Sequence, residues 1–191
     1  TGSGKTTVVS LIARFYDATG GEVLVDGVNV KDYTFDALYD RVGYVTQKAV
    51  LFSGTVKSNV LFGKSRGGRG DADVGKALDL AMASEFVDRL PQGMDSPIAQ
   101  GGTNVSGGQK QRLSIARALA RDPEIIIFDD SFSALDYRTD AALRAGLKSE
   151  LGGTTRLIVA QRIGTIRNAD KIIVLDDGKA VGIGTHDELM Q

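Results

Sequence analysis

The hydrophobic residues of this 191-residue chain follow two spacings, one typical of helices and one typical of buried strands. Apolar residues at helical spacing predict a helix over residues 8–15. Two continuous apolar runs, "EIIIFDD" at 124–130 and "TTRLIVAQ" at 154–161, are typical of strands buried on both faces of a parallel sheet. The shorter segment "DRVGYVTQ" at 40–47 predicts a third strand, which ends at Gln47.

Turn residues divide the rest of the chain into hairpins and helices. Both "GEVLVDGVNV" at 21–30 and "KIIVLDDGKAVGIG" at 171–184 contain an Asp-Gly pair, which predicts two hairpins. Helical spacing dominates from about 56 to 120, interrupted by a glycine-rich loop at 63–73, and a further helix is expected at 141–151. Strands that alternate with helices, together with a helical insert, predict an α/β protein with an appended helical subdomain.

Composition narrows the class of protein. Apolar residues make up 42% of the chain and charged residues 25%, which is typical of a single globular domain. The net charge of −1 gives no electrostatic reason to expect a nucleic-acid partner. The chain has no cysteine, which excludes a disulfide framework and a thiolate zinc site, and no apolar run reaches the ~18 residues of a membrane span.

The first seven residues, "TGSGKTT", contain the last six positions of a phosphate-binding P-loop. Glycines allow the backbone N–H groups to curl around a phosphate, the Lys5 ammonium can reach the β- and γ-phosphates, and the Thr6 hydroxyl can ligate Mg²⁺. A plain Gly/Ser linker is the alternative, but a helix is predicted directly behind the loop, as phosphate binding requires. The candidate phosphate-binding residues are Thr1, Gly2, Ser3, Gly4, Lys5, Thr6 and Thr7.

Two carboxylates follow the apolar run at 124–130. In open α/β sheets ligands bind beyond the carboxyl ends of the strands, where Asp129 and Asp130 are expected. Asp129 can hold the Mg²⁺ that bridges two phosphates, usually through water. The two residues could instead begin a turn, but a P-loop in the same chain favours the metal site.

A second anion-binding helix N-terminus is predicted at "VSGGQKQRLSIARALARDP", residues 105–123. "SGGQ" at 106–109 resembles the signature motif of ATP-binding-cassette (ABC) ATPases, and "SALD" at 133–136 resembles their D-loop. Gln47 matches their Q-loop glutamine, and "LFSGTVKSNVLFG" at 51–63 is similar to exporter-type members. The resemblance covers residues 1–191 without a gap.

The resemblance implies a P-loop NTPase fold of ABC type, with a mostly parallel core sheet, a small antiparallel β part and a helical subdomain. The expected division is an ATPase core at about 1–55 and 121–191 and a helical signature subdomain at about 56–120. The strands that open such a domain, and a transmembrane domain, are expected to precede Thr1. The domain is then expected at the cytoplasmic face of the cell membrane.

The family mechanism assigns roles to the motif residues. Two such domains close around two ATP molecules, and each ATP lies between the P-loop of one domain and the signature helix of the other. The resemblance implies that Thr6, Gln47 and Asp129 lie near Mg²⁺ and that Asp130, Gln161 and Gln47 serve hydrolysis. The residues implied to contact ATP across the dimer, or through the D-loop, are Ser106, Gly107, Gly108, Gln109 and Asp136.

Three positions depart from the family pattern. Asp130 stands where the family has the glutamate that polarises water, Gln161 where it has a histidine, and Gln100 where exporters usually have a glutamate. Aspartate is shorter by about 1 Å, and a displacement of that size can cost on the order of 100-fold in rate. A glutamine amide can donate a hydrogen bond, but it carries neither a proton nor a charge to the reacting phosphate.

These departures favour one half of a heterodimeric exporter, with a hydrolysis-impaired site of its own and an intact "SGGQ" that completes the site of a different partner chain. A homodimeric exporter with two active sites and a non-hydrolysing ATP-gated regulatory clamp are the alternatives. A DNA-repair or chromosome ATPase is disfavoured, because no long heptad run separates the P-loop from the signature.

Two smaller expectations concern surfaces. Tyr44 and Phe52 flank Gln47, and either they line a groove that receives the membrane domain or they pack in the core. The cations of the signature helix are expected on a solvated face, and they are Lys110, Arg112, Arg117 and Arg121.

Overall fold

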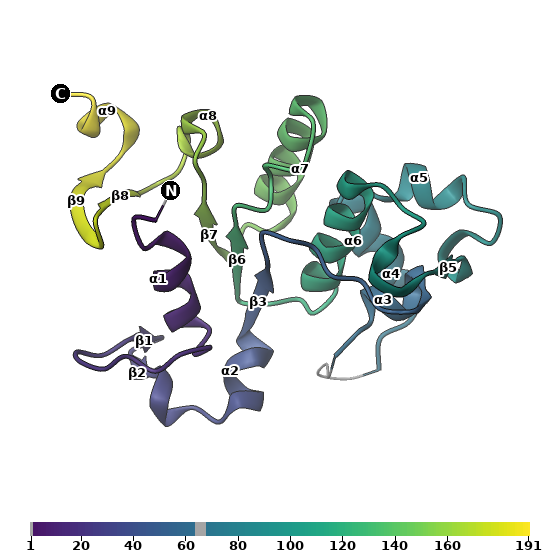
Figure 1. The fold of residues 1–191 in the computed structure, drawn as a ribbon, viewed down its shortest axis with the longest axis horizontal. Helices are drawn as coiled ribbons and strands as arrows, with labels where there is room; N and C mark the ends of the chain where they lie inside the picture. Colours follow the sequence, from purple (N-terminus) through teal and green to yellow (C-terminus); the bar gives the residue numbers. More distant parts are fainter. Residues whose placement is uncertain (1, 64–67) are drawn as a thin grey trace.

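The computed structural model describes residues 2–63 and 68–191. Its centre is a parallel sheet with the strand order β3-β6-β7, formed by β3 (Val42–Val45), β6 (Ile125–Asp129) and β7 (Thr155–Val159). Figure 1 shows this sheet in the middle of an elongated molecule. The three strands predicted from the apolar runs are therefore confirmed, each shorter than its run.

The central strand β6 is buried because it faces hydrophobic side chains on both sides of the sheet. Ile126 and Phe128 pack in a large cluster with Leu113 and Leu143, whereas Ile127 packs in a second cluster around Leu38, and all six side chains are fully buried. Adjacent residues of a strand point to opposite faces, so one continuous apolar run serves both clusters. The sheet thereby fixes the position of Asp129 at the carboxyl end of β6.

Short elements cover the face of the sheet that carries Ile127. The predicted hairpin at 21–30 is present, although each of its paired strands is only two residues long. The predicted helix at 8–15 begins earlier and ends at Ile12, and Arg14 then turns the chain with a φ of 53°. The elements of this part are α1 (Lys5–Ile12), β1 (Leu24–Val25), β2 (Val28–Asn29), η1 (Val30–Asp32) and α2 (Phe35–Arg41).

Helices dominate the middle of the chain, as predicted. The expected loop at 63–73 lies partly outside the described residues, and its last three residues are helical because Asp73 accepts a hydrogen bond from the Gly70 N–H and so caps α4. The elements here are β4 (Gly54–Thr55), α3 (Val56–Val60), α4 (Asp71–Leu80), α5 (Ser84–Asp88), η2 (Gly93–Asp95), β5 (Pro97–Ile98), η3 (Gln100–Gly102) and α6 (Gly107–Leu119).

The helix after β6 begins four residues earlier than predicted, because the Asp136 side chain caps it through the backbone N–H of Thr139. The hairpin predicted at 171–184 is present and turns at Asp177 and Gly178, with the left-handed φ values of 44° and 73° that such a turn needs. The remaining elements are α7 (Tyr137–Glu150), α8 (Ile163–Ile166), β8 (Ile172–Asp176), β9 (Lys179–Gly184) and α9 (His186–Leu189).

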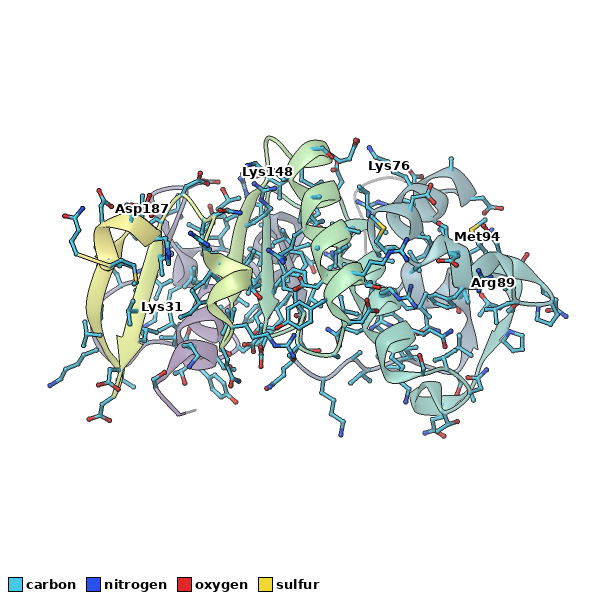
Figure 2. All side chains as sticks on the ribbon, turned by 90° about the horizontal axis from the view of Figure 1, so that it is seen from above. Lys31, Lys76, Arg89, Met94, Lys148 and Asp187 are labelled. Carbon is cyan, nitrogen blue, oxygen red and sulfur yellow. The ribbon has the colours of Figure 1, made fainter. Side chains whose placement is uncertain are left out.

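The β8–β9 hairpin lies at one end of the molecule and the helices around α5 at the other; Figure 2 shows Asp187 and Arg89 at these two ends. Among the described residues, β7 is paired with β6 alone, and Ile173 of β8 remains 57% exposed. The expectation that further strands of the domain precede Thr1 stays a prediction. Within the same described part, no helix has both the length and the hydropathy to cross a membrane.

The solvated face expected for the cations of the signature helix is wrong for three of the four. Arg112 donates to the carbonyl of Met82, Arg117 to that of Asn59, and Arg121 to that of Tyr39. Burial lowers the pKa of both Arg112 and Arg117. Long arginine stems can lie along apolar surface while the guanidinium satisfies carbonyls, which helical spacing does not reveal.

Candidate functional site

The loop before α1 adopts backbone angles that favour glycine. Gly2 and Gly4 both have a φ of 90°, and Gly4 is the N-cap of α1. A side chain at Gly2 would meet nothing within 4 Å, so the backbone conformation, not the space, calls for glycine there. The loop therefore ends on the N-terminus of a helix, where backbone N–H groups favour an anion. Thr1 lies outside the described residues.

A cleft of about 280 Å³ opens beside this loop. Because the carboxyl ends of parallel strands meet at one edge of a sheet, residues that follow β3, β6 and β7 line the cleft together with α1. The lining residues are Gly2, Gly4, Lys5, Thr6, Thr7, Gln47, Asp130, Val159 and Gln161. The structure thus brings together the residues predicted from the P-loop, the Q-loop and the two departures Asp130 and Gln161.

Lys5 and the buried carboxylate of Asp129 have defined partners. Lys5 Nζ donates to Ser3 Oγ at 2.9 Å, so the ammonium lies on the loop itself. Thr6 Oγ1 donates to Asp129 Oδ1 at 2.9 Å. Asp129 is 4% exposed. A hydroxyl and a carboxylate in contact at the end of β6 are the oxygen ligands that Mg²⁺ prefers.

The sequence analysis missed the part that Tyr44 plays at this carboxylate. Its hydroxyl donates to Asp129 Oδ2 at 3.0 Å, so both oxygens of Asp129 accept a hydrogen bond. Burial raises the pKa of Tyr44 to about 12, against an opposing contribution from Ser10 and with a smaller one from the charge of Asp129. The sequence carries no signal for this contact, because it depends on the register between β3 and β6, in which Tyr44 pairs with Ile127, two residues before Asp129.

Two amide groups converge on one oxygen of Asp130. Gln47 Nε2 and Gln161 Nε2 donate to Asp130 Oδ2 at 3.1 and 3.0 Å. Asp130 leaves β6 with a left-handed φ of 49°, and its N–H donates to the carbonyl of Val159 at 3.0 Å. That bond ties Asp130 to the end of β7, which explains why a residue 31 positions later contacts it.

The signature residues lie at the start of α6, in another part of the molecule. Ser106 Oγ accepts from the Gln109 N–H at 3.3 Å, and Gln109 Oε1 accepts from the Ser106 N–H at 2.8 Å, so the two residues form a capping box. Ser106 and Gly107 are exposed. Figure 1 shows α6 and α1 on opposite sides of the three-stranded sheet.

Asp136 also acts locally in this structure. It accepts hydrogen bonds from the N–H and the hydroxyl of Thr139, at 2.9 and 2.7 Å, and these bonds lower the pKa of the carboxyl. Among the described residues, neither Asp136 nor the signature residues line the cleft beside the P-loop. The structure therefore divides the candidate site residues into one group at the cleft and one group away from it.

Side chains of α6 hold the segment that carries Gln47. Gln111 is 2% exposed and donates to the carbonyl of Thr46 at 3.2 Å, and Arg117 donates to that of Val50 at 2.9 Å. Hydrogen bonds from side chains of the signature helix to backbone carbonyls therefore join it to the Q-loop segment. Sequence spacing does not indicate these contacts, because they join residues 65 and 67 positions apart.

Comparison with known proteins decides the family. The family described as ABC transporter matches residues 1–133. The chain belongs to this family. An uncharacterized ABC transporter ATP-binding protein of Mycobacterium tuberculosis is 48% identical over 194 residues, and a putative multidrug export ATP-binding/permease protein of Staphylococcus aureus is 44% identical over 189. The alignments cover 100% and 99% of this chain and 32% of each relative.

Solved structures of the ABC family include a close match to this fold. A bacterial Atm1-family ABC exporter with ATP bound is similar with a TM-score of 0.94 and 37% identity, over 100% of this chain and 33% of that chain. The predicted ABC-type α/β fold and the exporter-type nucleotide-binding domain are therefore confirmed. The chain spans about a third of the length of these relatives.

Proposed function

We propose that this chain is the ATP-binding motor domain of a heterodimeric exporter, and that its own site hydrolyses ATP slowly or not at all. Its signature helix would complete the hydrolysing site of a different partner domain. The observation that carries the proposal is the pair of glutamine amides on Asp130 Oδ2.

The amide pair occupies one oxygen of Asp130. Because Oδ2 already accepts from both Gln47 and Gln161, a water that is to be activated would have to displace one of these amides or use the other oxygen. The shorter aspartate side chain also moves the carboxylate by about 1 Å, which can cost on the order of 100-fold in rate. Gln161 supplies an amide where a charged or proton-carrying group would stabilise the transition state. Nucleotide binding requires none of these features.

The residues for binding ATP are present. The N–H groups at the start of α1, the Lys5 ammonium and the Thr6 hydroxyl surround the cleft, and they are groups that hold β- and γ-phosphates. Thr6, Asp129 and Gln47 would hold Mg²⁺, which when bound neutralises phosphate charge. The oxygen donors fit this ion, since Asp129 is buried and accepts from Thr6.

The signature residues are suited to a ligand that belongs to a partner. Helix α6 is 13 residues long, so its N-terminus favours an anion, and Ser106 at that end is exposed. Gln109 satisfies one local donor through the capping box. We propose that Ser106, Gly107, Gly108 and Gln109, with Asp136 nearby in the D-loop, contact the ATP of the partner domain.

A membrane domain would contact an aromatic surface beside the Q-loop. Phe52 and Phe62 stack at 4.2 Å and are 41% and 52% exposed, and the Arg117 guanidinium lies 5.2 and 5.5 Å from their centroids. Of the two residues predicted at such a groove, Phe52 is therefore exposed and Tyr44 faces Asp129 instead. With a membrane domain bound there, the chain would lie at the cytoplasmic face of the cell membrane.

The same proposal divides the chain as the family does. Residues 1–55 and 121–191 would form the ATPase core, and residues 56–120 the helical signature subdomain. The contacts of Gln111 and Arg117 with the Q-loop segment would then link the subdomain to the core.

Steady-state ATP turnover tests the proposal. The intact protein should be nearly silent when purified alone and active with the product of the neighbouring reading frame. In that complex Ser106→Ala should lower turnover about 100-fold or more, because it removes a group aimed at the partner's phosphate. Thr185→Ala removes the corresponding residue of a similar capping box in α9 and should leave turnover unchanged.

The two alternatives give different results in this assay. Turnover of about 1–10 s⁻¹ by the protein alone would contradict the heterodimer and indicate a homodimer in which Asp130 and Gln161 suffice. ATP binding without turnover, both alone and with the partner, would indicate a non-hydrolysing regulatory clamp.

A further inference from the structure

Tyr44 reaches the proposed metal-binding carboxylate from the neighbouring strand. It lies on β3, in register with Ile127 of β6, and its hydroxyl donates to Asp129 Oδ2 at 3.0 Å. Its ring packs on Phe15 with centroids 5.0 Å apart and planes tilted by 54°. The phenol is therefore held at two ends, by the aromatic contact and by the carboxylate.

We propose that Tyr44 is a positioning residue for Mg²⁺, which orients the carboxylate of Asp129. The inference rests on the proposed function, in which Thr6 and Asp129 hold the ion that accompanies ATP. Because Tyr44 occupies Oδ2, the other oxygen, Oδ1, is the one directed at Thr6. The carboxylate is thereby fixed with one oxygen on the side of the phosphate loop.

The chemistry of the two hydroxyl donors supports this assignment. Asp129 is 4% exposed, so its oxygens need hydrogen-bond partners, and a lysine or arginine partner would offset the negative charge that attracts a cation. A neutral phenol supplies the hydrogen bond and leaves that charge in place. Thr6 is itself a proposed metal ligand, whereas Tyr44 holds Asp129 from the far side, so its hold does not depend on the ion.

Groups that orient metal ligands affect the affinity for the ion, although they do not touch it. At position 44, the ring and the hydroxyl of tyrosine make separate contacts. A phenylalanine would keep the ring contact with Phe15 and lose only the hydroxyl. Tyr44→Phe is therefore a narrow change at this carboxylate.

The test measures ATP affinity of the intact protein by calorimetry, in excess Mg²⁺ and in EDTA. Tyr44→Phe should reduce the Mg²⁺-dependent gain in affinity roughly 3- to 10-fold, the size expected for one hydrogen bond. Its affinity in EDTA should stay within about 2-fold of wild type. Tyr33→Phe is the matched control, since Tyr33 donates to the carbonyl of Val25 at 3.1 Å and does not line the cleft.

Each outcome bears on one proposal. A Tyr44→Phe variant that keeps the full Mg²⁺-dependent gain, or that loses affinity equally in EDTA, overturns the inference and leaves the proposed function intact. A wild-type protein that binds no ATP under either condition contradicts the proposed function itself. If a partner domain contributes a second ATP site, the part of the binding heat that Lys5→Ala removes is the part that comes from this chain's own P-loop.

Discussion

The polar side chains in the cleft beside the P-loop and those at the N-terminus of α6 differ in their hydrogen-bond partners and in their exposure. In the cleft, Gln47 and Gln161 donate to Asp130 Oδ2, so the candidate catalytic groups bond to one another. At α6, the capping box between Ser106 and Gln109 satisfies the backbone locally and leaves Ser106 at the surface. The polar groups of the cleft therefore bond to one another, whereas Ser106 stays accessible at the surface.

Under the proposed function, this difference would separate ATP binding from ATP hydrolysis within one chain. The phosphate loop, Thr6 and Asp129 would hold the nucleotide and its Mg²⁺, while two of the three positions that depart from the family pattern, Asp130 and Gln161, meet at the point where water would be activated. The signature residues keep the pattern without change. A chain that altered both regions would suit a purely regulatory role, whereas altering one suits a division of labour between two domains.

The largest expected effect comes from restoring the cleft. The double variant Asp130→Glu, Gln161→His should raise turnover at this chain's own site about 10- to 100-fold, because it returns the longer carboxylate and a group that can carry a proton. Turnover is measured in the dimer with the partner's own P-loop lysine replaced, so that one site reports. An unchanged rate would show that Asp130 and Gln161 are not what limits hydrolysis.

A smaller effect concerns the anchoring of α6. Arg117→Ala should lower the free energy of unfolding by about 2 kcal/mol, because it removes the donor to the part-buried carbonyl of Asn59 and the donor to the exposed carbonyl of Val50. Chemical denaturation measures the change.

The control for Arg117 is Arg89→Ala. Arg89 forms an exposed pair with Glu85 at the end of the molecule (Figure 2), and losing it should cost less than about 0.5 kcal/mol. Equal losses for the two variants would mean that the contacts of Arg117 with the Q-loop segment contribute no more than a surface ion pair.

The smallest expected effect is a pH dependence of stability that comes from Tyr44. Folding raises the pKa of Tyr44 from 10.0 to about 12, so the fold favours the neutral phenol. The resulting stabilisation is fully present below pH 10 and is lost as the pH rises toward 12. Between pH 9 and 11.5, wild type should lose about 1 kcal/mol more than Tyr44→Phe, a value reduced for partial exposure. Parallel denaturation curves for the two proteins would contradict this.

Local sequence signals predicted much of the fold. The presence of α1 behind the P-loop, β6 in a continuous apolar run, and the C-terminal turn at Asp177 and Gly178 were predicted, because each depends on neighbouring residues alone. Element ends were less predictable. Helix α7 begins at Tyr137 because Asp136 caps it, a contact that hydrophobic spacing does not register.

The sequence motifs predicted most of the residues that line the cleft. They did not predict which of these side chains form hydrogen bonds with one another. Tyr44 meets Asp129 across 85 positions, and Gln47 meets Asp130 across 83. Such contacts exist because a parallel sheet places the ends of strands that are distant in sequence at one edge. Sequence patterns carry the local preferences of each segment, while the register between β3, β6 and β7 sets which side chains touch.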